Sequence, residues 1–167
     1  MNCYQNIWYI GTLVRTAWVD EGVNSFALAA GVDGYLYNQE AGLDDGSQIP
    51  ALPIDAYIES SPLELGEGYQ FSFIRRLIPD ITFTGSNVAS PTVDMTIKAQ
   101  DFPGGGFEGE DISNVIRTAT SPVERFTEQN YIRIRGRSFS LRVDSDTLGT
   151  KWRLGTPRIE IRQDGRR

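Results

Sequence analysis

Three runs near the C-terminus alternate apolar and polar residues, and this period of two is what most constrains the fold. The runs lie in residues 131–145 (YIRIRGRSFSLRVDS) and 158–163 (RIEIRQ). Successive side chains of a strand point to opposite faces, so the pattern is typical of half-buried strands in an antiparallel sheet. Here the polar positions are mostly arginine, as where Ile132 and Ile134 alternate with Arg133 and Arg135.

This arginine-rich end differs in charge from the rest of the chain. Residues 131–167 hold nine arginines and Lys151 against four acidic residues, a formal charge of +6. The other 130 residues carry 6 basic and 18 acidic groups, or −12. The net charge of −6 argues against a chain that binds nucleic acid over its whole surface. One cationic segment in an otherwise acidic protein therefore needs an explanation.

The remaining patterns also predict strands. Residues 92–100 alternate cleanly, with Val93, Met95, Ile97 and Ala99 expected to point inward. Further strand patterns cover 54–60, with Ile54, Ala56 and Ile58 alternating against polar neighbours, 69–85 with a break at Pro79, and 114–123 with an end at Pro122. No segment predicts a helix of three turns, although 123–130 comes nearest. The fold class is therefore all-β, with an antiparallel β-sandwich over residues 50–167.

The N-terminal part is expected to differ from this sandwich. Residues 41–53 are rich in Gly, Asp and Pro, which makes them the best candidate for a linker or domain boundary. Residues 1–48 contain about three more strands, with a turn at Asp33-Gly34. Such a segment has too little apolar material for an independent domain. We expect it to pack on the sandwich, on another subunit or on chain not present here.

The composition excludes several kinds of chemistry. The chain has no His and only Cys3, so it lacks the usual base of a nucleophilic triad and the ligands of a zinc site. We expect neither an enzyme nor a cofactor. A glycan hydrolase needs only two carboxylates, but no acidic pair stands out among the 22 acidic residues. No run of about 18 apolar residues is present, so no membrane span is expected.

Four local motifs each allow a functional alternative. We favour a turn over a calcium loop at Asp44-Asp45, and a hairpin tip over a phosphate loop at residues 103–106 (PGGG). For Arg75-Arg76 we expect at least one side chain to point inward to a carboxylate, as a structural ion pair rather than a ligand contact. Trp152 is expected to point inward between Lys151 and Arg153. The aromatic residues that could stack on a sugar are expected instead in the core or at a subunit interface; they are Trp8, Trp18, Tyr35 and Tyr37.

The arginine strands allow three interpretations: a solvated sheet face, a contact with nucleic-acid phosphates, or an interface with an acidic neighbouring subunit. The third is favoured because the acidic remainder of the chain supplies such a neighbour. The candidate interface residues are Arg133, Arg135, Arg137, Arg142, Arg158 and Arg162.

The chain resembles the C-terminal part of the tail nozzle or stabilisation proteins of short-tailed bacteriophages. The likeness rests on an ordered series rather than on one motif. It includes residues 8–18 (WYIGTLVRTAW), 33–46 (DGYLYNQEAGLDDG), 56–68 (AYIESSPLELGEG), 73–85 (FIRRLIPDITFTG), 90–107 (SPTVDMTIKAQDFPGGGF), 121–137 (SPVERFTEQNYIRIRGR) and the end through Trp152-Arg-Leu-Gly155 to Asp164-Gly-Arg-Arg167.

This resemblance implies that residues 1–48 are the last strands of a β-propeller and that a sandwich follows from residue 50. Members of the family are much longer, so the chain is expected to be a short form or the end of a larger product. The implied role is structural: a homo-oligomeric ring below the portal, in the virion tail, in contact with other tail proteins and transiently with passing DNA. The alternative function is a carbohydrate-binding module for attachment to the host surface.

Overall fold

The structure is a computed structural model, and it describes residues 13–64, 70–102 and 117–165. These residues are strands, turns and loops without a helix, so the all-β prediction is confirmed. The chain divides into two compact units, Met1–Gly42 and Leu43–Arg167. The division lies within the polar segment 41–53. Trp8 and the PGGG motif at 103–106 lie outside the described residues.

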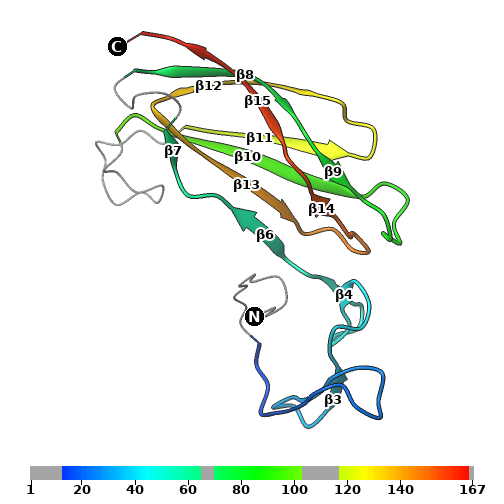
Figure 1. Cartoon of the computed structure of the whole chain (residues 1–167). Helices are drawn as coiled ribbons and strands as arrows, with labels where there is room; N and C mark the ends of the chain where they lie inside the picture. Colours follow the sequence, from blue (N-terminus) through cyan, green and yellow to red (C-terminus); the bar gives the residue numbers. More distant parts are fainter. Residues whose placement is uncertain (1–12, 65–69, 103–116, 166–167) are drawn as a thin grey trace. The chain divides into compact units, whose positions relative to one another are not determined.

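The first unit contains a small antiparallel sheet in the order β1-β2-β3 (Figure 1). Its strands are β1 (Ala17–Val19), β2 (Leu28–Ala30) and β3 (Leu36–Asn38). The predicted turn at Asp33-Gly34 is confirmed. Gly34 has a φ of 84°, the left-handed conformation that glycine adopts without strain, and Asp33 Oδ1 accepts a hydrogen bond from Tyr35 N (3.2 Å).

The second unit begins with short strands. The hairpin of β4 (Asp44–Asp45) and β5 (Leu52–Pro53) confirms a turn after the acidic pair. An antiparallel sheet then has the order β11-β10-β13-β6, from β11 (Arg117–Glu124), β10 (Thr92–Gln100), β13 (Ser138–Ser145) and β6 (Ala56–Glu59). The short strand β7 (Leu63–Glu64) also pairs with β13. We refer to these strands as the five-stranded sheet.

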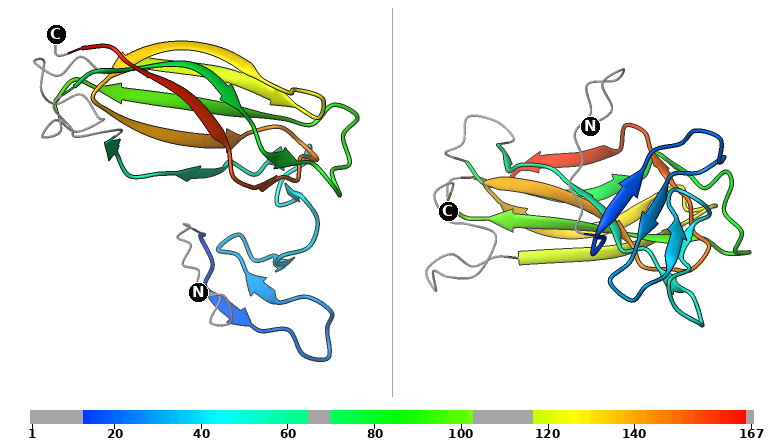
Figure 2. Two further views of the ribbon diagram at one scale, coloured as in Figure 1. Left: turned by 45° about the horizontal axis from the view of Figure 1, so that its top comes forward. Right: turned by 90° about the horizontal axis from the view of Figure 1, so that it is seen from below.

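A second sheet has the order β12-β8-β15. Its strands are β12 (Asn130–Gly136), β8 (Ser72–Ile78) and β15 (Arg158–Gln163). Figures 1 and 2 show these strands in one layer and β10, β11 and β13 in another. Beside them, β9 (Ile81–Thr82) pairs with β14 (Arg153–Leu154).

The two sheets share one hydrophobic core. The inward residues of β10 (Val93, Met95, Ile97 and Ala99) are all buried, as the alternation predicts, and they join one cluster with residues of the facing sheet: Ile74, Leu77, Ile132 and Ile134. Two sheets packed face to face over one core is the arrangement that a β-sandwich requires. The antiparallel β-sandwich predicted for residues 50–167 and the propeller resemblance of residues 1–48 stay predictions.

In β6, Ile58 pairs with the core residue Val143 but is 53% exposed, because β6 is the last strand of its sheet. Two sequence expectations need correction. Pro122 does not end its strand: it lies inside β11, which is tolerated because β11 is an edge strand. Residues 63–64, expected as loop, form β7. By contrast, the predicted break at Pro79 is confirmed, because β8 ends at Ile78.

Candidate interaction surface

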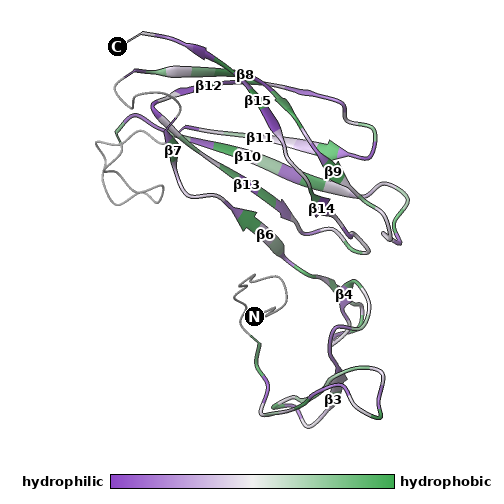
Figure 3. Ribbon diagram, in the orientation of Figure 1, coloured by the Kyte–Doolittle hydropathy of each residue, from purple (hydrophilic) through white to green (hydrophobic). Residues whose placement is uncertain are grey.

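The outer side of the β12-β8-β15 sheet is an arginine-rich surface. Its inner side carries Ile74, Leu77, Ile132, Ile134 and Ile159, which line the core. The alternation of side chains therefore turns the intervening residues of the same strands outward. In Figure 3 the hydrophilic colour recurs along β12 and β15. We call this surface the arginine face; among the described residues its arginines are Arg75, Arg76, Arg133, Arg135, Arg158 and Arg162.

Four of the six predicted interface residues lie on this face: Arg133, Arg135, Arg158 and Arg162. Arg142 does not, because β13 belongs to the facing five-stranded sheet. Arg137 lies between β12 and β13, and its guanidinium stacks on the rings of Phe71 (4.9 Å) and Phe102 (5.6 Å). The run YIRIRGRSFSLRVDS thus crosses from one sheet to the other, and its arginines do not share one surface.

Arg75 and Arg76 belong to the arginine face through an irregularity in β8. The register of β8 shifts against both neighbouring strands between Ile74 and Arg76. Both Ile74 and Leu77 stay buried, while Arg75 is exposed and Arg76 half-exposed. The expectation that strict alternation turns one arginine inward is therefore wrong. A β-bulge keeps two successive charged residues out of the core.

Some arginines on the face have carboxylate partners. Arg76 Nη2 lies 2.9 Å from Glu160 Oε2, and Arg76 Nη1 donates to Gln129 Oε1 (3.0 Å), so the predicted ion pair is confirmed. Arg135 donates to the carboxylate of Asp164, and its guanidinium lies 4.0 Å from the centre of the Phe71 ring. These contacts give Arg76 and Arg135 a role in holding the sheet together.

Three other arginines on the face lack such a partner. Within residues 13–64, 70–102 and 117–165, no carboxylate forms an ion pair with Arg75, Arg133 or Arg158. All three are exposed. Arg133 of β12 and Arg75 of β8 both lie in the irregular part of the strand pairing, between the pairs Tyr131–Arg76 and Ile134–Ile74. Two like charges on adjacent strands repel each other.

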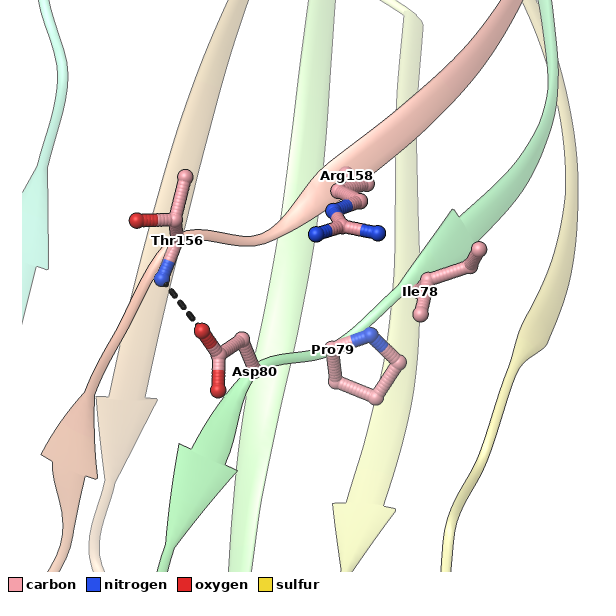
Figure 4. A pocket seen from close by; sticks show the side chains of 5 residues that line it. All are labelled: Ile78, Pro79, Asp80, Thr156 and Arg158. Carbon is pink, nitrogen blue, oxygen red and sulfur yellow. Dashed lines mark hydrogen bonds between the residues drawn. The ribbon is translucent and has the colours of Figure 1, made fainter.

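Arg158 also borders a small pocket of about 280 Å³ (Figure 4). The other lining residues are Ile78, Pro79, Asp80 and Thr156. Asp80 Oδ2 accepts a hydrogen bond from Thr156 N (2.7 Å), which joins the residue before β9 to the segment after β14. The pocket lining therefore combines the apolar side chains of Ile78 and Pro79 with the guanidinium of Arg158.

Arg142 lies in a charged cluster on the outer side of the five-stranded sheet. Glu59 accepts from Lys98 Nζ (2.6 Å) and lies 3.4 Å from Arg142 Nη1, while Arg142 Nε donates to Asp144 Oδ1 (3.1 Å). The hydrogen bond from Lys98 lowers the pKa of Glu59 against the opposing effect of burial, and Arg142 adds to the lowering. The guanidinium of Arg142 also stacks on Tyr57 at 4.2 Å. These contacts are internal and join β6, β10 and β13.

Two aromatic residues of the first unit, Trp18 and Tyr35, are not in a core. Trp18 is 48% exposed and Tyr35 is 68% exposed, so the core alternative does not hold for these two residues, and the interface alternative stays a prediction. Trp18 and Tyr37 lie on the same sheet face, because both pair in register with Ala29. The hydrogen bond from Tyr37 lowers the pKa of Asp33, and Arg15 stacks on the Tyr37 ring at 4.5 Å. In the second unit, Trp152 packs against the core as predicted.

The described residues contain no group of three His, Cys, Asp or Glu side chains that could hold a metal ion. They also contain no helix that is long and apolar enough to cross a membrane. No protein-family model matches the chain, and no curated protein matches it.

Proposed function

We propose that this protein is a structural component of a bacteriophage tail. It assembles with copies of itself in a ring below the portal, and the arginine face contacts an acidic surface of the neighbouring subunit. The observation that carries the proposal is that Arg75, Arg133 and Arg158 are exposed on one sheet face without a carboxylate partner in the described part of the chain. The ordered resemblance to tail nozzle proteins supports the location in the virion.

A solvated surface is a poor account of this face. Like charges on neighbouring strands repel each other, so Arg75 and Arg133, which lie in the same irregularity of adjacent strands, have an energetic cost in the isolated chain. A neighbouring carboxylate would remove that cost and form hydrogen bonds with the planar guanidinium groups. The chain itself is acidic, with a net charge of −6, so a second copy supplies suitable groups.

Protein contact accounts for the face better than DNA contact. A phosphate-binding surface attracts the backbone of any duplex, and a channel that held passing DNA in this way would slow its exit. Carboxylates of a neighbouring subunit would cover the arginines and leave the acidic surfaces of the ring toward the channel. Electrostatic complementarity between subunits also fixes their register.

The test is to locate the protein in purified virions of a phage that encodes it. Mass spectrometry should detect the chain among the virion proteins in a fixed ratio to the portal protein. A cryo-EM reconstruction of the tail should place several copies in a ring around the channel, with the β12-β8-β15 sheet at a subunit contact. A chain that is absent from virions, or present only as an isolated monomer, would show the proposal to be wrong.

A carbohydrate-binding module is the second candidate, and one observation favours it. Trp18 and Tyr37 lie two strands apart on one face of the β1-β2-β3 sheet, and Trp18 is half-exposed. An aromatic pair of this kind can stack on sugar rings. A glycan array should then give binding that Trp18→Ala removes and Trp152→Phe does not. An array without hits would reject this candidate.

A further inference from the structure

We infer that the N-terminal unit of one copy is the partner of the arginine face of another, with Asp20 and Glu21 facing Arg75 and Arg133. This inference rests on the proposed self-assembly and adds to it the identity of the acidic surface. The contact is head-to-tail, because each copy offers one acidic unit and one arginine face. Repeated around an axis, such a heterologous contact forms a ring when its rotation closes.

Charge selects the N-terminal unit. Residues 1–42 contain four acidic residues and one basic residue, Arg15, whereas residues 43–167 contain 18 acidic and 15 basic residues. Each segment therefore has an excess of three negative charges. In the N-terminal unit this excess is spread over 42 residues, and in residues 43–167 it is spread over 125, so the N-terminal unit has the higher density of negative charge. Asp20 and Glu21 are adjacent, both exposed, and begin the loop between β1 and β2. Two neighbouring carboxylates at a loop suit two guanidinium groups on adjacent strands.

The N-terminal unit also has surface to bury. Among its described residues, Ala29 is the only buried hydrophobic residue. Three large apolar residues close to the acidic pair in sequence are exposed: Val19, Val23 and Phe26. The three strands in the described part of this unit have three residues each and cannot by themselves build a core large enough to stabilise it. It therefore gains stability from a partner surface that accepts both its acidic and its apolar side chains.

The arginine face offers both kinds of contact. Tyr131 is exposed on β12 two residues before Arg133, and Ile78 is partly exposed at the end of β8, beside the pocket at Arg158. The ring of Tyr131 and the side chain of Ile78 can pack against Val23 and Phe26, while the unpaired arginines meet the carboxylates. Apolar contacts surrounded by complementary charges are usual in specific protein interfaces.

The experiment uses two charge-reversed forms of the full chain. Form one carries Arg75→Glu with Arg133→Glu, and form two carries Asp20→Arg with Glu21→Arg. Each alone should lose the ring, with the dissociation constant of the contact raised tenfold or more. A 1:1 mixture of the two forms should assemble, although neither form assembles alone.

In that mixture, the acidic N-terminal unit of form one meets the arginine face of form two. The arginines introduced at positions 20 and 21 of form two in turn meet the glutamates introduced at positions 75 and 133 of form one. Both contacts are therefore complementary, and mixed complexes should appear although neither form assembles alone. A chain that carries all four substitutions should assemble by itself, because its two charged surfaces are reversed together.

Two controls keep the outcome decisive. Arg153→Glu changes an exposed arginine of β14, outside the arginine face, and should leave assembly unchanged. Glu21→Arg alone leaves the hydrogen bond from Trp18 Nε1 to Asp20 Oδ1 (2.7 Å) in place, so it tests the contact without disturbing the first unit. Circular dichroism of each variant checks that the strands persist.

The possible results separate the two proposals. If form one loses the ring but form two and Glu21→Arg keep it, the N-terminal unit is not the partner, although assembly through the arginine face stands. If the wild-type chain does not assemble at all, the proposed function itself fails. Mixed complexes from two forms that are each monomeric would support the inference, and their absence would overturn it.

Discussion

Arg75 of β8 and Arg133 of β12 lie on adjacent strands within the same irregularity of the strand pairing, and both are exposed. On either side of this pair, Arg76 and Arg135 are held by Glu160 and Asp164. The sheet thus neutralises its flanking arginines and leaves the middle ones without a partner among the described residues. This difference separates arginines that stabilise the sheet from arginines that are available for binding.

The first prediction concerns the stability of the unassembled chain. Arg133→Gln should leave the free energy of unfolding unchanged or slightly higher, because it removes a repulsion and no ion pair. Urea denaturation at a concentration where the chain is monomeric measures the effect. Arg135→Gln is the matched comparison and should destabilise, since Arg135 pairs with Asp164 and stacks on Phe71. A marked loss of stability in Arg133→Gln would mean that Arg133 has a structural role.

The second prediction concerns pH. The pKa of Glu59 is lowered in the folded state by the hydrogen bond from Lys98, so ionised Glu59 stabilises the fold above its unfolded-state pKa, near 4.5. This contribution is lost as the pH falls through the lower, folded-state pKa. Glu59→Gln should therefore be less stable than the wild type at pH 7, and the difference should shrink below about pH 4.5.

Urea denaturation between pH 7 and pH 3 measures this difference. Glu128→Gln, at an exposed position outside the cluster, is the control and should change little at any pH. A difference between Glu59→Gln and the wild type that stays constant over the whole range would contradict the role assigned to the Lys98–Glu59 pair.

The third prediction concerns the crossing from β12 to β13. A Cβ added at Gly136 would lie 2.9 Å from Ala99 Cβ and 3.0 Å from the carbonyl oxygen of Gln100. Gly136→Ala should therefore destabilise the second unit by about 1–3 kcal/mol, the usual cost of overpacking. Gly46→Ala is the matched control, because no atom lies within 4 Å of its added Cβ. Equal stability of the two variants in thermal denaturation would contradict the close approach.

Much of the fold follows from local pattern. The alternation in 92–100 predicts β10 with its inward residues, and Pro79 predicts the end of β8, because each signal depends on neighbours in the sequence. The exposure of Ile58 and the error at Pro122 have a different origin. The position of a strand at the edge or the centre of a sheet depends on its pairing with distant strands. The side-chain pattern of a single strand does not indicate this position.

The candidate surface could be predicted only in part for the same reason. Arg133, Arg135, Arg158 and Arg162 share a face because their strands flank β8, and the alternation shows that they point away from the core. The assignment of Arg142 to the other sheet depends on the crossing at Gly136–Arg137. Arg75 joins the face through a bulge that breaks the alternation, although two successive arginines within an apolar strand are themselves a signal of such a bulge.

The fourth prediction concerns salt. If carboxylates of a neighbour meet exposed arginines, assembly should weaken strongly between about 50 mM and 500 mM NaCl, because the screening length falls over this range. Sedimentation velocity at a fixed protein concentration measures the assembled fraction. Glu160→Gln leaves Arg76 without its partner and should make assembly more sensitive to salt. Assembly that is insensitive to salt would indicate a mainly apolar interface.

The most direct test of the account is the native mass of the chain and of its Arg75→Glu, Arg133→Glu form, measured side by side at low salt. The account predicts a single closed oligomer for the wild type, a monomer for the double variant, and a wild-type oligomer for the Arg153→Glu control. A wild-type mass equal to one chain, or an oligomer that survives reversal of both arginines, would contradict it.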